Sequence, residues 1–252
     1  MEITHFLYHF ARHFFLAKNA HGLHSPFVFD LYQELFAVKK EYYAFKEIQD
    51  LRFNFLQDHE LIEIQDFGTG KSEKRKVSDL AKKSAISRKK GEFLFKLVNY
   101  FQPKIILELG TSLGIGTAYL EKARPESKIF SFEGSESLLN QAKKHLQKSS
   151  LVQGNLDNSL KFMTDKMSHV DFVFFDANHR FEPTIRYFEI CLAKAHENTV
   201  FVFDDIHWSA EMSLAWKKVC AHPYVTLSLD FLEIGLVFFR MKQPKQHFLL
   251  KF

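Results

Sequence analysis

The sequence of 252 residues contains only two cysteines, Cys191 and Cys220. Their spacing fits neither a paired metal motif nor a disulfide framework, so no disulfide is expected, and a reducing cytoplasm is the favoured location. No run of 18 apolar residues occurs, and the N-terminus lacks a basic region followed by an apolar core and a cleavage site. We therefore expect neither a membrane-spanning helix nor a secretory signal, and no membrane partner.

Apolar runs alternate with amphipathic segments from residue 102 onward, and hydrophobic residues make up 46% of the chain. Strands that alternate with helices predict a doubly wound, mostly parallel α/β sheet of the Rossmann-like type. Val225–Leu229 and Gly235–Arg240 are too close for a helical crossover, so they predict a C-terminal antiparallel hairpin. The predicted strands before this hairpin are Lys104–Leu109, Lys128–Phe132, Ser150–Gln153, Asp171–Phe175 and Thr199–Phe203.

Helical spacing also marks the N-terminal segment. We predict a helical extension and basic linker over residues 1–86 and one catalytic domain over residues 87–252, with Ser87 as the N-cap of its first helix.

A glycine-rich turn follows the first predicted strand, in the stretch IILELGTSLGIGT from Ile105 to Thr117. Glycine allows a sharp turn and close approach of a ligand, and a following helix N-terminus presents unpaired N–H groups. A dinucleotide loop of the G-x-G-x-x-G/A type would place the bulky Tyr119 at its last position, and no Gly-Lys-Ser/Thr follows as in a nucleoside triphosphate loop. Nicotinamide, flavin and triphosphate cofactors are therefore disfavoured.

The pattern E-x-G-x-x-x-G-x-G, followed by an acid at the end of a second strand, resembles motifs I and II of class I S-adenosylmethionine-dependent methyltransferases. The resemblance spans roughly residues 87–240 and implies that Glu108 and the glycine loop hold the methionine part of the cofactor. It implies also that Glu133 takes the ribose hydroxyls and that the turn after the third strand flanks the adenine. The residues that it assigns to the cofactor are Glu108, Gly110, Thr111, Ser112, Gly114, Glu133, Gly134, Asn155, Asp157 and Asp176.

Three carboxylates stand at the ends of the next two strands, at Asp176, Asp204 and Asp205. Ligands of open α/β sheets bind outside the carboxyl ends of the strands, so we expect these acids to face the same crevice as the glycine loop. Clustered carboxylates favour a hard divalent cation such as Mg²⁺ or Ca²⁺. The alternative is that Asp204 or Asp205 caps the helix expected near Trp208 to Ala221.

The acids also resemble those of the catechol O-methyltransferase-like branch, which binds a metal through an acid after the fourth strand and an acid-amide pair after the fifth. The chain departs from that pattern at Asp205, where many members carry Asn, and at His179, where the branch typically has a catalytic Lys. An imidazole with a pKa near 6.5 can accept a hydroxyl proton at neutral pH. We therefore predict Asp176 and His179 as catalytic residues, with His179 as the general base.

Nine Lys or Arg residues against two acids lie between Gly70 and Lys90. Such a cluster suits either a solvated linker or an anionic partner. The leading prediction is metal-assisted O-methylation of a small hydroxylated acceptor by a protein that could form a homodimer. The alternatives are a tRNA or rRNA methyltransferase and a non-catalytic nucleic-acid-binding protein with a methyltransferase-like fold.

Overall fold

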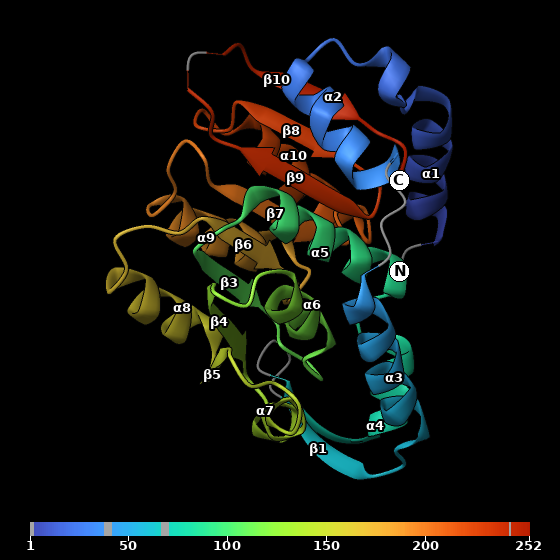
Figure 1. Cartoon of the computed structure of the whole chain (residues 1–252), viewed down its shortest axis with the longest axis vertical. Coiled ribbons are helices and arrows are strands. Elements are labelled where there is room, and N and C mark those ends of the chain that lie inside the picture. The colour runs from blue at the N-terminus through green and yellow to red at the C-terminus, as the bar shows by residue number, and fades with distance from the viewer. Residues whose placement is uncertain (1–2, 38–41, 67–70, 242) are drawn as a thin grey trace. The chain divides into compact units, whose positions relative to one another are not determined.

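The computed structural model describes residues 3–37, 42–66, 71–241 and 243–252 (Figure 1). The chain divides into two compact units. One consists of Met1–Gln33 together with Met163–Phe252, and the other of Glu34–Phe162. None of the described helices is both long and apolar enough to cross a bilayer. The predicted domain boundary at residue 86 stays a prediction.

Three parallel strands form the sheet of the unit Glu34–Phe162, in the order β3 (Ile105–Leu109), β4 (Lys128–Glu133) and β5 (Ser150–Gln153). Parallel neighbours need a crossover, and helices α6 (Ile115–Ala123) and α7 (Glu136–Lys143) supply it. Helix α8 (Leu156–Asp165) follows β5. These strands begin and end within one residue of the predicted ones.

Tyr119 joins three helices of this unit, α3 (Tyr43–Gln57), α5 (Arg88–Phe101) and α6. Its ring is fully buried, lies 6.2 Å from the ring of Phe45, and its hydroxyl accepts a hydrogen bond of 2.8 Å from Gln49 Nε2. Gly91 in α5 lies against the same ring, since a Cβ at that position would be 2.2 Å from Tyr119 Cε2. The close approach of α5 to α6 therefore depends on Gly91. Ser87 caps α5 as predicted, because its Oγ accepts from Lys90 N at 3.3 Å.

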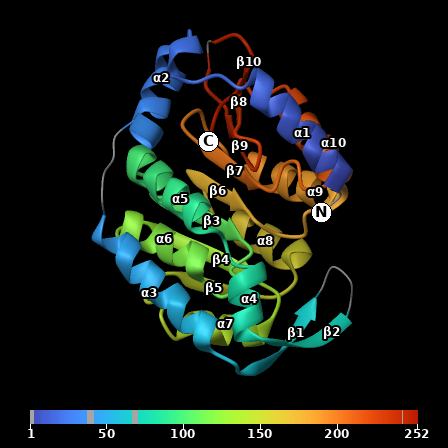
Figure 2. The ribbon, with the colours of Figure 1, turned by 90° about the vertical axis from the view of Figure 1, so that its right-hand side faces the viewer.

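The basic segment is not a linker over its described length. Strand β2 (Lys71–Lys76) pairs in antiparallel register with β1 (Leu61–Asp66), helix α4 (Val77–Lys83) follows, and α5 begins at Arg88 (Figure 2). Residues 67–70 lie outside the described residues. Ordered backbone hydrogen bonds thus hold a segment whose charge predicted a solvated connection.

The other unit carries five strands in the order β10-β8-β9-β7-β6. β6 (Phe172–Phe175) and β7 (Val200–Asp204) are parallel, with helix α9 (Phe181–Leu192) between them along the chain, and α10 (Ala210–Ala221) follows β7. β8 (Leu227–Asp230) and β9 (Ile234–Phe238) pair with each other in antiparallel register, which confirms the predicted hairpin. The two units thus hold five and three strands of a mostly parallel, Rossmann-like sheet, which confirms the fold class.

The sequence predicts a seven-stranded sheet, with five parallel strands and the two of the hairpin, whereas the described residues form eight strands. The additional strand is β10 (Gln246–Leu249) in the C-terminal tail, which runs parallel to β8. Its four residues, Gln-His-Phe-Leu, lack the continuous apolar run by which the other strands were predicted.

The core of this unit lies around β6 and β7, whose residues are all buried. Parallel strands covered on both faces read as continuous apolar runs, as these do. Phe175 and Phe203 stack at 4.2 Å with their rings 7° apart. Figures 1 and 2 show that the N-terminal helices α1 (Ile3–Leu16) and α2 (Pro26–Tyr32) lie beside β8 and β10. Lys18 pairs with Leu250 there. Two short helical turns complete the described elements, η1 (Ala20–Gly22) and η2 (Gln33–Ala37).

Candidate functional site

The glycine loop joins β3 to α6 in a backbone conformation that side chains rarely adopt. The φ angles of Gly110, Ser112 and Gly114 are 107°, 51° and 77°. Gly114 is also the N-cap of α6, and a Cβ there would lie 2.9 Å from Leu146 Cδ1. Positive φ and lack of space together explain why glycine stands at this position. The loop thus presents the N-terminus of a helix behind a tight turn, which suits a bound ligand.

Glu108 lies behind this loop and is buried. Its Oε2 accepts hydrogen bonds from the hydroxyls of Thr117 and Ser131. Thr111 Oγ1 in turn lies 2.6 Å from Ser131 Oγ. A Cβ at Gly116 would lie 2.8 Å from Glu108 Oε1. In the described structure Glu108 thus braces the loop, and its predicted contact with a cofactor stays a prediction.

Glu133, the acid at the end of β4, is bonded to the same loop. Its Oε2 accepts from Ser112 N and its Oε1 from Ser135 N, both at 2.9 Å. Gly154 N, at the end of β5, donates to the backbone oxygen of Glu133 at 3.0 Å. The structure therefore brings together the predicted cofactor residues of the loop and of β4, including the adjacent Gly134.

Asn155 and Asp157 have local roles at the start of α8. Asn155 Oδ1 accepts from Asp157 N at 2.9 Å, and Asn155 O accepts from Ser159 N at 3.0 Å. The side chain of Asp157 is exposed. Asn155 thus closes the turn that begins this helix, as Asn does at helix starts. Contact of either residue with an adenine ring stays a prediction.

The three predicted metal ligands follow β6 and β7, which are neighbours in parallel register. Asp204 is buried, whereas Asp176 and Asp205 are partly exposed. Asp205 has a φ of 53°, and the two residues at the other strand end, Asn178 and His179, have φ angles of 62° and 34°. Left-handed backbone at residues other than glycine costs free energy and concentrates at functional sites. The carboxyl ends of these two strands therefore have the backbone features of a site.

His179 is held at this end by Asp176, with 3.5 Å between Nε2 and Oδ1. Burial lowers the pKa of His179, but its hydrogen bond and ion pair with Asp176, and the charges of Asp205 and Asp204, outweigh burial and raise this pKa to about 9. The unperturbed imidazole pKa near 6.5, on which the prediction of a general base rests, therefore does not apply to His179 in this environment. The surrounding carboxylates make the site strongly negative, and this field retains a proton on the imidazole at neutral pH.

The alternative explanation of the acids, that they cap the helix after β7, is wrong. Ser209 is the N-cap of α10, and its Oγ accepts from Met212 N at 3.2 Å. Asp204 is the last residue of β7. Asp205 begins the turn that follows, in which Trp208 N donates to Asp205 O at 3.0 Å. The carboxylates of Asp204 and Asp205 are therefore not required for this helix start.

Three side chains meet at metal-ligand distances elsewhere. Among the described residues, only His169, Asp171 and His196 bring three such ligand atoms within 4.8 Å of one another. Asp171 precedes β6 and thus lies at the opposite end of that strand from Asp176. His196 Nδ1 accepts from Asn198 N at 3.2 Å, so Nε2 carries the proton that bonds Asp171 Oδ1 at 2.9 Å. This pair is therefore a structural hydrogen bond. The metal ligands predicted from the sequence, Asp176, Asp204 and Asp205, are other residues, and their role stays a prediction.

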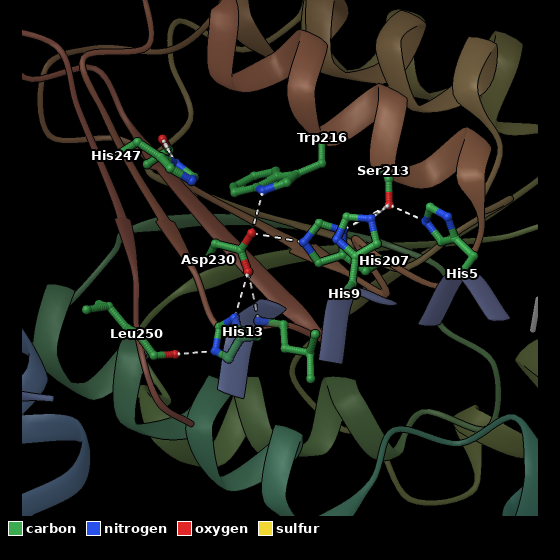
Figure 3. Close-up of polar contacts among 11 residues, drawn as sticks. His5, His9, His13, His207, Ser213, Trp216, Asp230, His247 and Leu250 are labelled. Atoms are coloured by element: carbon green, nitrogen blue, oxygen red, sulfur yellow. Dashed lines mark hydrogen bonds and ion pairs between the residues drawn. The ribbon is translucent and has the colours of Figure 1, made fainter. Parts of the chain in front are cut away.

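The sequence prediction missed a cluster of histidines in the same unit (Figure 3). His5, His9 and His13 of α1 lie against His207, Ser213 and Asp230. We name these six residues the histidine cluster. The four-residue spacing in α1 was visible in the sequence, but its partners lie about 200 residues away along the chain.

Several cationic side chains of the basic segment are buried or form ion pairs within the unit. Lys90 is buried, Arg88 Nε bonds Glu92 at 2.6 Å, and Arg75 lies 3.3 Å from Glu73. Fewer cations are therefore available for phosphate groups than the sequence count indicates. Binding of RNA through this segment stays a prediction.

A family model described as "Methyltransferase domain" matches residues 107–206. The matched range runs from β3 to the residue after Asp205 and includes the glycine loop. No curated protein sequence matches the chain. The family match confirms the predicted resemblance to methyltransferases.

Solved structures with the same fold include three methyltransferases. The SAH-bound methyltransferase PaMTH1 from Podospora anserina is 16% identical, with 79% of this chain and 89% of that chain covered and a TM-score of 0.58. TomG from Streptomyces achromogenes, an O-methyltransferase in complex with SAM, is 19% identical, with 80% and 91% covered and a TM-score of 0.56. An O-methyltransferase from Bacillus cereus in complex with SAH is 19% identical, with 80% and 93% covered and a TM-score of 0.56. At these identities the likeness shows a shared fold.

Proposed function

We propose that this chain transfers the methyl group of S-adenosylmethionine to a hydroxyl oxygen of a small acceptor. The chain matches a methyltransferase domain and shares the fold of O-methyltransferases. The family match carries this proposal, because residues 107–206 include the glycine loop and the acids that follow β6 and β7. The three solved structures support it, since two are O-methyltransferases and each is bound to SAM or SAH.

The glycine loop fits this cofactor. Gly114 has no space for a Cβ and begins α6, while Glu133 fixes Ser112 through its backbone N–H. Bound there, S-adenosylmethionine supplies an electrophilic methyl group. We assign its binding to the loop, the strand end of β4 and the turn before α8, at Glu108, Gly110, Thr111, Ser112, Gly114, Glu133, Gly134, Asn155 and Asp157, and to Asp176 at the end of β6.

A divalent cation fits the acids by the chemistry of its donors. Asp176, Asp204 and Asp205 offer oxygen atoms only, as Mg²⁺ and Ca²⁺ prefer. The raised pKa of His179, to about 9, supports this assignment, because burial lowers this pKa and the three carboxylates more than offset burial. When bound, such a cation lowers the pKa of a substrate hydroxyl and orients it.

We assign to His179 the role of general base, which accepts the hydroxyl proton of the acceptor. Its Nε2 is oriented by Asp176 at 3.5 Å, and the left-handed backbone at residues 178 and 179 fixes the turn that carries it. An imidazole accepts a proton only in its neutral form, so this role requires that the charge of the three carboxylates be offset. Asp176 therefore has two roles in the proposal, as an oxygen ligand and as the residue that orients His179.

The first experiment is a calorimetric titration of S-adenosylmethionine into the full chain in Mg²⁺ buffer. We expect saturable binding that Gly114→Ala weakens. Absence of binding by the folded protein would refute the proposed cofactor.

The second experiment screens hydroxylated acceptors, with RNA in the same panel, by the release of S-adenosylhomocysteine. Asp176→Asn and His179→Gln should each lower turnover by about 100-fold or more, as loss of acid-base catalysis does. The chain offers matched controls at the other end of β6, where Asp171 bonds His196 as Asp176 pairs with His179. Asp171→Asn and His196→Gln should keep turnover. Equal turnover in both sets would refute the catalytic assignment, and methylation of RNA alone would refute the small acceptor.

A further inference from the structure

Helix α1 docks through its polar stripe rather than through its apolar face. His5, His9 and His13 follow one another at four-residue spacing, so they share one face of the helix. That face lies against α10 and the loop before it (Figure 3). Leu7 and Phe14, on other faces, are exposed. Directed contacts of the histidines, rather than apolar burial, therefore select the position of α1.

Each histidine of the stripe has a different partner. His5 Nε2 lies 2.8 Å from Ser213 Oγ in the first turn of α10. His9 stacks on His207 with 4.0 Å between the ring centres and 16° between the planes. His13 Nε2 donates to Leu250 O at 2.9 Å, and its Nδ1 lies 3.7 Å from Asp230 Oδ1.

His207 is the centre of these contacts. Its Nε2 lies 2.9 Å from Asp230 Oδ2, and its Nδ1 lies 2.9 Å from Ser213 Oγ. Asp230 also accepts from Trp216 Nε1 at 3.3 Å and from Leu232 N at 2.9 Å. Both His207 and Asp230 are buried, so their orientations are fixed by contacts that solvent does not replace.

This fixed residue stands two positions after Asp205 in the loop that leaves β7. Asp205 in this loop has a left-handed φ of 53°, which costs free energy, and Ile206 N donates a long hydrogen bond of 3.3 Å to Glu233 O, so added contacts that hold the loop stabilise this conformation. The bonds from His207 to Asp230 at the end of β8 and to Ser213 in α10 join the loop to both neighbours.

We infer that His207 is a positioning residue, which holds the loop of Asp204 and Asp205 in the conformation that binds a divalent cation, and that His9 of α1 completes this support by stacking on it. The inference rests on the proposed function, because it assumes that the two carboxylates are metal ligands. Residues that orient metal ligands affect metal affinity without touching the ion. The N-terminal helix is thus part of the active unit rather than a separate extension.

The experiment measures binding of Mn²⁺ to the full chain by calorimetry, with S-adenosylmethionine binding and circular dichroism recorded for each variant. His207→Phe keeps an aromatic ring for His9 and removes both hydrogen bonds; it should weaken Mn²⁺ binding by about tenfold or more. His207→Gln retains a donor that reaches Asp230 and should restore most of this loss. His9→Leu, a milder change, should weaken binding by about threefold. The control is His247→Phe, which removes the hydrogen bond between His247 of β10 and Ser228 Oγ of β8. This variant should bind Mn²⁺ as the parent does.

The outcomes separate the inference from the proposed function. If the parent binds Mn²⁺ and folded His207→Phe binds it equally, the positioning role is overturned and the proposed metal site stands. If the folded parent binds no Mn²⁺, the metal site and the positioning role both fail, while binding of S-adenosylmethionine decides the rest of the proposed function. If His207→Phe does not fold, His9→Leu decides: a loss relative to His247→Phe supports the inference, and equal affinity overturns it.

Discussion

Acidification should loosen the histidine cluster through His9. Burial is the largest cause that lowers the pKa of His9 to about 4, and the charges of His207, His5 and Arg12 act in the same direction, while Asp230 opposes them. His9 is therefore neutral in the folded protein at pH 5, whereas the same imidazole in the unfolded chain has a pKa near 6.5 and carries a proton. The unfolded state thus binds more protons between pH 6.5 and pH 4.

The sign and size of the effect follow from this difference. The contribution of His9 to the free energy of unfolding is fully present above pH 6.5 and is lost as the pH falls towards 4. With pKa values of about 4 and 6.5, His9 alone would reduce the free energy of unfolding by about 2 kcal/mol at pH 5 relative to pH 7.5. Because its side chain is only partly buried, solvent screening reduces this to about 1 kcal/mol. His13 and His247 also have lowered pKa values, mainly because of burial, and add to the loss in the parent.

The assay is urea unfolding of the parent, His9→Leu and Leu7→Ala at pH 7.5 and pH 5. His9→Leu should lose about 1 kcal/mol less than the parent on acidification, because it lacks the titrating group. Leu7→Ala, on the exposed face of the same helix, should show the pH dependence of the parent. If the parent and His9→Leu lose the same free energy, the argument from burial of His9 is refuted.

Three further substitutions test the packing of single residues. Gly91→Ala should lower the free energy of unfolding by about 2 kcal/mol, because its Cβ would lie 2.2 Å from Tyr119 Cε2, and the added substitution Tyr119→Leu should recover part of this loss. Gly114→Ala should weaken the binding of S-adenosylmethionine by about tenfold. Gly114 has a φ of 77°, so an alanine there adds strain of about 1 to 2 kcal/mol that shifts the loop. An unchanged affinity by calorimetry would contradict this prediction. Ser209→Ala should lower the free energy of unfolding in urea by about 1 kcal/mol, whereas no change would contradict the stabilising role of the Ser209 cap.

The strands of the sheet could be predicted because burial on both faces leaves a simple record in the sequence. The runs FVFF of β6 and VFVFD of β7 are apolar up to the strand end, and both strands are buried throughout. The β1–β2 hairpin could not be found in this way. Strand β2 reads KSEKRK, so its hydrogen bonds to β1 hold it without an apolar face. Charge alone predicted a linker there, and backbone pairing decided the structure.

The candidate site was predictable in its positions and not in its electrostatics. Acids after β6 and β7 must lie at one edge, because parallel neighbours end at the same side of a sheet. The pKa of His179 depends on three carboxylates from two strand ends, and only their spacing in three dimensions shows that they outweigh burial. His179 could therefore be named from the sequence as a candidate, whereas the upward shift of its pKa could not be predicted.

The histidine cluster shows why apolar patterning failed in α1. A rule that buries apolar residues and exposes polar ones would turn Leu7 and Phe14 towards the protein, whereas the structure exposes them and directs the histidines inward. Burial of an imidazole is favourable only where partners meet its nitrogens, and those partners, Ser213 and Leu250, come from the other end of the chain. The docked position of α1 thus depends on contacts that β8, α10 and the residue after β10 supply. A helix selected in this way is sensitive to the state of its partners, which is the physical basis for coupling α1 to the loop of Asp204 and Asp205.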